Sequence, residues 1–150
     1  MRKLPAALTV LGMAALGTVI PVSSAHAVES CADNYRNAAS GYMYAYDYVD
    51  CVGPLGRDDA NDSNWGDSSH QFRGSDTNKA SSILNKGNHQ EVQFFNGTGT
   101  GWTGGHTCLA RSEHYASDLT NNYFTSGYSA NNSISSHRWV GASTCDRWAT

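Results

Sequence analysis

The stretches "TNKASSIL" at residues 77–84 and "ANNSISSHRW" at residues 130–139 share one pattern of asparagine and serine. The matching positions lie a constant 54 residues apart: Asn78 with Asn132, Ser81 with Ser135, and Ser82 with Ser136. A fixed offset between matching positions is typical of a duplicated structural unit. We therefore expect two copies of one motif, at approximately residues 40–86 and 91–141.

The first copy begins with an alternating aromatic run, "GYMYAYDYV", at residues 41–49. Successive side chains of a strand point to opposite faces, so this period of two predicts an aromatic strand. Tyrosines occupy one face and other residues the opposite face: Tyr42, Tyr44, Tyr46 and Tyr48 against Met43, Ala45 and Asp47. We expect these tyrosines, with Phe94, Tyr123 and Trp139, to supply much of the core.

The residues that follow, 53–69, are rich in Gly, Asn and Asp and predict a long polar loop. We expect Trp65, in the middle of this loop, to be exposed.

The second copy predicts further short elements. "EVQFFNG" at residues 91–97 and "SISSHRWV" at 133–140 predict strands, "TGTGWTGGHT" at 98–107 predicts a glycine-rich turn, and residues 108–119 fit a short strand or one helical turn. Short strands with frequent turns, and no long period of 3.6, favour an all-β sandwich or barrel over a helical bundle. Each copy fits one four-stranded antiparallel unit that buries its apolar face best against the other copy.

The N-terminal residues are organised like a secretory signal peptide. A basic start precedes an apolar run at residues 6–20, and "AHA" at 25–27 is a small-x-small cleavage site. No stretch approaches the roughly 20 apolar residues that a membrane span requires. We expect residues 1–27 to be removed and residues 28–150 to be secreted as a single monomeric domain without a membrane span.

The charge of the mature chain argues against nucleic acid as a partner. The full chain has 10 basic and 13 acidic residues and a formal net charge of −3. Removing Arg2 and Lys3 with the signal peptide changes this net charge to −5. Surfaces that bind phosphate backbones usually carry a basic stripe, and an acidic chain does not favour one.

All four cysteines lie in the exported part of the chain, where an even number predicts disulfides. Four cysteines allow three connectivities. We favour Cys31 with Cys51 and Cys108 with Cys145, because each bridge then stays inside one copy of the motif.

The sequence offers little for catalysis. Five histidines are scattered singly along the mature chain: His70, His89, His106, His114 and His137. No His-Glu-x-x-His zinc motif and no Gly-x-Ser-x-Gly nucleophile elbow occurs. We expect a protein that binds rather than an enzyme, with no required cofactor.

An aromatic strand, a glycine turn and a closing Asn-x-x-Ser-Ser segment, all present twice, resemble the Greek-key motif of the βγ-crystallin fold. Tyr46 precedes Gly53 by seven residues, and Phe94 precedes Gly101 by seven. The resemblance implies two Greek-key motifs packed as a βγ-crystallin-like sandwich, stapled by the disulfides.

In that fold the serine of the closing segment ties down the glycine hairpin. The resemblance therefore implies that Ser82 and Ser136, or their neighbours Ser81 and Ser135, hydrogen-bond the folded-over turn.

With its signal peptide and disulfides, the chain also resembles, over roughly residues 31–140, the secreted bacterial peptidase-inhibitor family whose type member is a streptomycete metalloproteinase inhibitor. That resemblance implies an extracellular metalloprotease as partner. An inhibitor needs an exposed, rigid loop, because preorganisation reduces the entropy lost on binding. The candidate loop is Cys51, Val52, Gly53, Pro54 and Leu55, which a bridged Cys51 and Pro54 would stiffen. A second candidate is the glycine-rich turn around Trp102.

The βγ-crystallin fold hosts several functions, and two alternatives stay open: a killer-toxin-like antimicrobial module and a calcium-binding protein. "NNSISS" at residues 131–136 fits the family calcium pattern (Asn/Asp)-(Asn/Asp)-x-x-(Ser/Thr)-Ser, whereas "TNKASS" departs from it at Thr77. The resemblance implies these ligands: Asn131, Asn132, Ser135, Asn78 and Ser81. Oxygen donors suit a hard cation, and asparagine in place of aspartate lowers the ligand charge.

Overall fold

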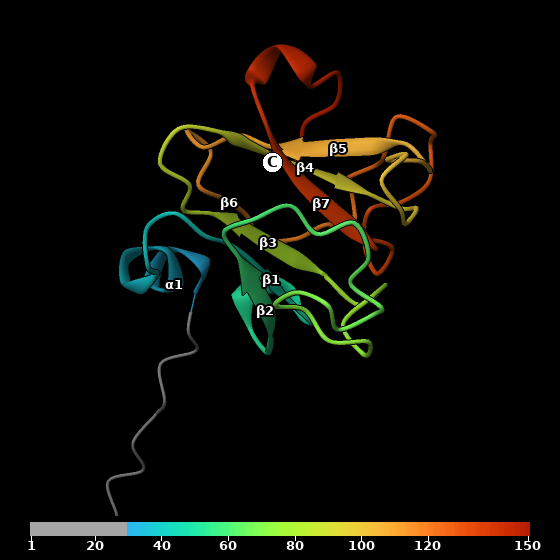
Figure 1. Cartoon of the computed structure of the whole chain (residues 1–150). Helices are drawn as coiled ribbons and strands as arrows, with labels where there is room; N and C mark the ends of the chain where they lie inside the picture. Colours follow the sequence, from blue (N-terminus) through green and yellow to red (C-terminus); the bar gives the residue numbers. More distant parts are fainter. Residues whose placement is uncertain (1–29) are drawn as a thin grey trace, which may run out of the picture.

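The computed structural model describes residues 30–150 and shows two small β-sheets with one short helix beside them (Figure 1). The elements are α1 (Cys31–Asn37), β1 (Met43–Tyr46), the 3-10 turn η1 (Val49–Cys51), β2 (Pro54–Asp58), β3 (Ser82–Asn85), β4 (Glu91–Phe95), β5 (His106–Leu109), β6 (Tyr115–Ala116), β7 (Ser136–Val140) and η2 (Ala142–Thr144). The expected signal peptide lies outside the described residues. Within residues 30–150, no helix has the length and apolarity to cross a bilayer.

One strand of the second copy, β6, joins the sheet formed by the first copy. One sheet has the order β2-β1-β3-β6 and the other β5-β4-β7, all antiparallel. In the first sheet, Ile83 of β3 pairs with Ala116 of β6. The 54-residue offset relates Ile83 to His137 and Ala116 to Asp62. His137 and Asp62 also pair, but only as a single isolated bridge. The structure thus confirms the predicted all-β fold of two interlocked Greek keys.

The pairing register corrects the predicted alignment of the first strands. Tyr46 pairs with Ser82, and Phe95 pairs with Ser136. The counterpart of Tyr46 is therefore Phe95, and the alignment of Tyr46 with Phe94 is wrong by one residue. The glycine spacing misled because the β4–β5 hairpin is longer than the β1–β2 hairpin, so glycines seven residues on are not equivalent.

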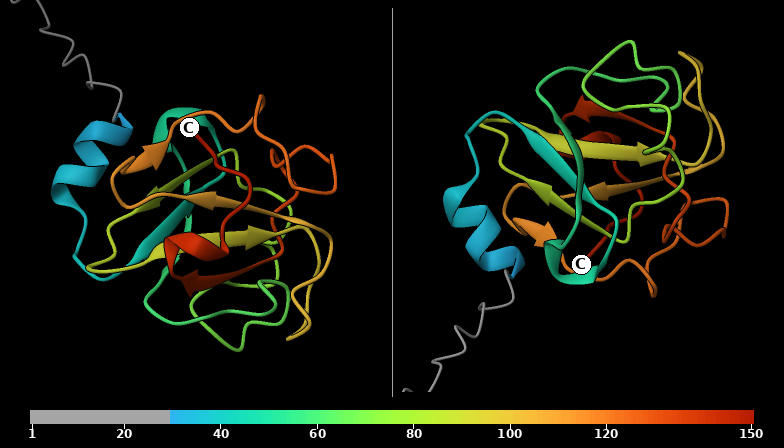
Figure 2. Two further views of the ribbon diagram at one scale, coloured as in Figure 1. Left: turned by 90° about the horizontal axis from the view of Figure 1, so that it is seen from above. Right: turned by 90° about the horizontal axis from the view of Figure 1, so that it is seen from below.

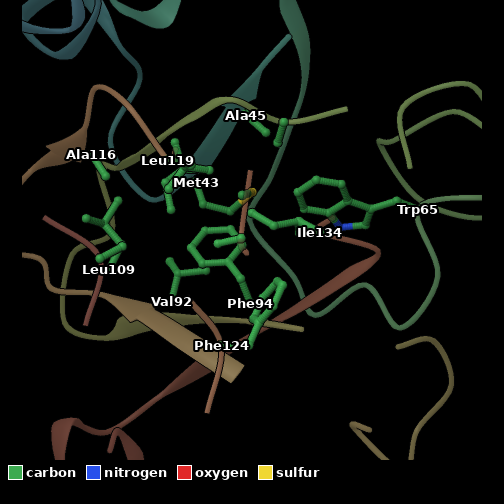
Figure 3. Packing of buried hydrophobic residues seen from close by; sticks show 14 of the residues in the cluster. Met43, Ala45, Trp65, Val92, Phe94, Leu109, Ala116, Leu119, Phe124 and Ile134 are labelled. Carbon is green, nitrogen blue, oxygen red and sulfur yellow. The ribbon is translucent and has the colours of Figure 1, made fainter. Parts of the chain in front are cut away.

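The main core lies between the two sheets (Figure 3). From the strands it takes Met43, Ala45, Ile83, Val92, Phe94, Leu109 and Ala116, and from the connections Trp65, Phe72, Leu119, Phe124 and Ile134. The non-tyrosine face of β1 therefore faces this core, contrary to expectation. Phe94 is buried as expected, Trp139 packs against the core from its edge, and Tyr123 is exposed.

The tyrosine face of β1 contributes to a smaller cluster outside the first sheet. Tyr46, Leu84 and the buried disulfide Cys31–Cys51 form it, and Tyr35 of α1 packs on it. Figure 2 shows α1 on this flank, beside β6. Sequence patterning did not predict α1. Ser30 caps it by accepting a hydrogen bond from the Asp33 N–H, the usual role of serine at this position.

Both favoured disulfides, Cys31–Cys51 and Cys108–Cys145, are present. Neither bridge joins the two copies: Cys31 precedes the first copy and is tied to it at Cys51, and Cys145 follows the second copy and is tied to it at Cys108.

The polar loop predicted at residues 53–69 is in part a strand, because β2 takes up Pro54–Asp58. The remainder is ordered by side chains that accept hydrogen bonds from backbone N–H groups two residues on, as in Asx turns. The acceptors are Asp58, Asp62, Asn64 and Asp67. These short-range bonds shape the loop without any regular element.

Trp65 is fully buried, contrary to expectation. Its ring stacks on Phe72 at 3.9 Å, and its indole N–H donates to Nδ1 of His137 at 2.8 Å. The other imidazole nitrogen of His137 lies 3.0 Å from the Ala60 carbonyl oxygen. The 54-residue offset relates Trp65 to Leu119 and His137 to Ile83. Leu119 and Ile83 are both apolar residues of the main core, so the Trp65–His137 hydrogen bond has no equivalent at these positions.

Candidate functional site

The loop between β1 and β2, taken with Pro54 at the start of β2, forms an exposed apolar surface at residues 47–54. Tyr48 is 61% exposed, Val49 42% and Val52 37%. Large apolar side chains grouped on one exposed loop are typical of an interaction site. We call residues 47–54 the binding loop.

Hydrogen bonds and a disulfide fix the binding loop from beneath. The Cys51 N–H donates to Ser82 Oγ at 3.0 Å, and Ser82 Oγ donates to the Tyr48 carbonyl oxygen at 2.6 Å. Asn34 Nδ2 donates to the Cys51 carbonyl oxygen at 3.0 Å, and the disulfide joins Cys51 to Cys31. The loop is therefore held in one shape before any partner arrives.

The backbone of the binding loop is unusual for its residue types. Asp50 and Cys51 have φ of 56° and 59°, in the left-handed region that non-glycine residues rarely adopt. Gly53 has φ of 69°, and a Cβ there would lie 2.9 Å from the Tyr48 ring. Glycine is thus required at position 53, and the anchors on Cys51 hold the rest of the turn.

The predicted inhibitory residues do not all point the same way. Val52 and Pro54 are exposed, Gly53 is half-buried and Cys51 is buried in the disulfide. Leu55 packs against the main core from within β2, so its side chain belongs to the scaffold.

Sequence reasoning missed Tyr48 and Val49 as loop residues, since Tyr48 continues the alternating aromatic run. The signal that could have found them is Gly53, which marks the end of a tight hairpin.

A groove of about 350 Å³ adjoins the binding loop. Its lining includes Asn37 at the end of α1, the capping residue Ala38, Tyr44 of β1, and Pro54 and Arg57 of β2. The guanidinium of Arg57 lies over the Tyr42 ring, 4.7 Å from its centre, and makes no ion pair with any described residue. The groove therefore combines apolar walls with an unpaired positive charge.

The second candidate loop, around Trp102, is packed onto the molecule. The Trp102 ring lies 5.3 Å from the Phe95 ring, and the Arg138 guanidinium lies over it. Trp102 is half-buried, so it is an anchor of the β4–β5 hairpin rather than a free contact residue.

The closing serines perform two different tasks. Ser82 and Ser136 tie the hairpins as expected, since Ser136 Oγ donates to the Gly97 carbonyl oxygen at 2.7 Å. The neighbouring serines instead bind the opposite copy of the motif: Ser81 Oγ donates to Asn132 Oδ1 at 3.1 Å, and Ser135 Oγ donates to Asn78 Oδ1 at 2.8 Å.

The structure thus brings four of the five predicted calcium ligands together as two symmetric pairs, each shared between the copies. Asn78 and Asn132 both have left-handed backbones, with φ of 57° and 55°. The fifth residue, Asn131, has a buried Oδ1 atom without a hydrogen-bond partner. These ligands are amide and hydroxyl oxygens and therefore carry no charge. In residues 30–150 no three His, Cys, Asp or Glu side chains gather as a metal site.

No protein-family model and no curated protein sequence matches the chain. A solved structure described by the words "Evolution of the eye lens beta-gamma-crystallin domain fold" is 20% identical, with a TM-score of 0.51, and the match covers 69% of this chain and 89% of the other. A βγ-crystallin from an archaeon is also 20% identical, with a TM-score of 0.48, and the match covers 68% of this chain and all of the other. The first similarity shows that the fold is βγ-crystallin-like.

Proposed function

We propose that this βγ-crystallin-like protein is a secreted inhibitor of an extracellular protease, and that it presents the binding loop to the protease cleft. The observation that carries the proposal is the exposure of Tyr48, Val49 and Val52 on a loop fixed by a disulfide and by Ser82. A loop that is already rigid loses little entropy on binding, so more of its contact energy becomes affinity. The two disulfides support export, because such bridges persist in oxidising compartments.

The groove beside the binding loop supports a protein partner rather than a small ligand. It extends the apolar surface of the loop toward α1, and Arg57 adds a positive charge at its wall. A partner that inserts the loop into its cleft would place an acidic residue of its rim against Arg57, where complementary charge adds specificity.

Replacing Val52 with Asp tests the inhibitory role of the loop. We expect the purified mature protein to inhibit a thermolysin-like metalloprotease at near-stoichiometric ratio, because such clefts accept apolar side chains. Val52→Asp should raise the inhibition constant at least about 30-fold, the loss typical of a hot-spot residue. The matched control is Thr100→Asp, at an exposed position of the other hairpin, and it should inhibit like the wild type.

The assay should include a serine protease, and circular dichroism should show that each variant is folded. Full inhibition by Val52→Asp would eliminate the loop as the contact. Failure of the folded wild type to inhibit any protease in the panel would eliminate the proposed function.

Calcium binding is a second candidate function, favoured by the unpartnered oxygen of Asn131 beside the Asn132–Ser81 pair. The paired oxygens are 2.8 Å and 3.1 Å apart, which suits two ligands at 2.3–2.6 Å from one Ca²⁺ ion. The residues present fit the ion in donor type and spacing. Neutral donors imply weak affinity, in the range of about 10⁻⁴ to 10⁻³ M seen for extracellular modules.

Thermal unfolding at increasing calcium concentration tests this second function. At ten times the dissociation constant, bound calcium should add about 1.4 kcal/mol to the free energy of unfolding. The increment should shrink in Ser81→Ala and Ser135→Ala, and remain in Ser126→Ala, which lies outside the two pairs. An equal increment in all variants would contradict calcium binding at these pairs. So would the absence of any increment in the wild type at about 10 mM calcium, ten times the upper end of the expected dissociation constants.

A further inference from the structure

A second cavity, of about 180 Å³, lies beside Gly41 and Asp59, next to the start of β1 and the end of β2. This is the end of the first hairpin opposite the binding loop. The cavity is lined by the indole of Trp139 and by four exposed polar side chains: Asp59, Asn88, His89 and Gln90.

Hydrogen bonds fix the backbone that borders the cavity before any ligand binds. Asn85 is fully buried, accepts a hydrogen bond from the Gly87 N–H at 2.8 Å and donates to the Gln90 carbonyl oxygen at 3.2 Å. The Gly41 N–H donates to the Lys86 carbonyl oxygen at 2.9 Å. The turn of residues 86–90 is therefore fixed, and its polar side chains start from a defined backbone.

Trp139 gives the cavity an aromatic wall. A Cβ at Gly87 would lie 2.4 Å from Cζ3 of Trp139, so the turn lies directly against the indole edge. The indole Nε1 is buried and has no hydrogen-bond partner among the described residues. The turn therefore meets the benzene part of the indole, and Nε1 is covered by protein atoms.

The composition of the cavity selects the class of ligand. Its volume is below the roughly 300–1,000 Å³ of sites for drug-sized molecules, so it accommodates about one ring. No Lys or Arg lines it, which disfavours phosphate or another anion. Carboxylate, amide and imidazole groups supply both donors and acceptors, and an aromatic ring packs against the apolar face of a sugar.

The geometry points to a binding site for a single hexose ring, such as the terminal residue of a glycan, in the cavity that Trp139 and the turn of residues 86–90 border together. The site is separate from the binding loop. It would let the protein attach to a glycan while the binding loop remains free.

A nuclear magnetic resonance titration tests this site with glucose, galactose, mannose and N-acetylglucosamine as probes. The four tryptophans give four indole N–H signals, and the Trp139 signal is assigned by its loss in Trp139→Phe. One of the sugars should shift the Trp139 signal in a saturable way. Gln90→Ala, which removes one polar group at the surface, should weaken that binding about tenfold. Trp148→Phe, an exposed control, should bind like the wild type.

The result that would overturn the site is no saturable shift at Trp139 with any of the four sugars, or equal shifts at all four indoles. Val52→Asp should still bind the sugar, and Trp139→Phe should still inhibit the protease. The two variants therefore distinguish a failure of the glycan site from a failure of the inhibitory loop.

Discussion

Acidification from pH 7 to pH 4 should lower the free energy of unfolding by about 3 kcal/mol through His137 alone. Complete burial lowers the pKa of His137 to about 4, from an ordinary value of 6.5. The Asp58 carboxylate and the Ala60 carbonyl oppose this shift, and His70 adds to it. The imidazole is thus neutral in the folded protein at a pH where the unfolded chain already binds a proton.

The lowered pKa of His137 sets the direction in which the free energy of unfolding changes with pH. The contribution of His137 is fully present above pH 6.5 and is lost as the pH falls toward 4, because the unfolded state then binds more protons than the folded state. Asp62 acts in the opposite direction: burial raises the pKa of its carboxyl group, so the folded state gains relative stability when that group is protonated. The measured loss is therefore a sum over several groups. The pKa values of His106, Asp33, Asp67 and Asp118 are also lowered and act in the direction of His137, whereas Asp62 opposes it.

Urea unfolding of the wild type and His137→Gln, each at pH 7 and pH 4, isolates the histidine. Glutamine retains a donor and an acceptor but does not titrate, so this variant should lose about 3 kcal/mol less than the wild type over the same interval. The exposed His89→Gln variant should behave like the wild type. Equal losses in the wild type and His137→Gln would contradict a depressed pKa at this buried site.

The sequence predicted the architecture because its pattern repeats. The 54-residue offset in the closing segments is the offset that relates the Ser81–Asn132 contact to the Ser135–Asn78 contact. Repetition is a property of the linear chain, so it can be read without coordinates.

The face of β1 could not be predicted in the same way. Met43 and Ala45 face the main core, while Tyr46 faces the smaller cluster under α1. Both faces are at least partly covered, so a period of two shows that the segment is a strand without showing which side is inside. The unpredicted helix α1 provides the cover on the tyrosine side.

The binding loop shows a related limit. A bridged cysteine beside a glycine and a proline predicts a stiff turn, and this pattern indicates Cys51 and Val52. The alternating run predicts Tyr48 in the core, because nothing in the local sequence shows that the run ends in solvent, where Tyr48 is 61% exposed. Its exposure depends on Ser82, which holds the Tyr48 carbonyl from a strand 34 residues away.

Trp65 is held by a hydrogen bond to His137, 72 residues further along the chain. Replacing Trp65 with Ala should cost at least about 4 kcal/mol of unfolding free energy. Removing a fully buried tryptophan costs about 3–5 kcal/mol through lost burial and the cavity that remains. The change also leaves Nδ1 of the buried His137 without its donor, which adds about 1–3 kcal/mol. A loss of this size is a large fraction of the roughly 5–15 kcal/mol that stabilises a domain.

Chemical denaturation of a set of variants separates the contributions. Leu119→Ala, at the position that the repeat relates to Trp65, should cost about 2–5 kcal/mol, because it leaves a cavity but breaks no side-chain hydrogen bond. Trp65→Phe keeps an aromatic ring against Phe72 and should therefore cost less than Trp65→Ala, and it remains measurable if Trp65→Ala does not fold. Trp148→Ala, at an exposed position, should cost little. If Trp65→Phe and Trp148→Ala were equally stable, the polar loop would not depend on its buried tryptophan, and the contact between Trp65 and His137 would not be what closes that loop onto the core.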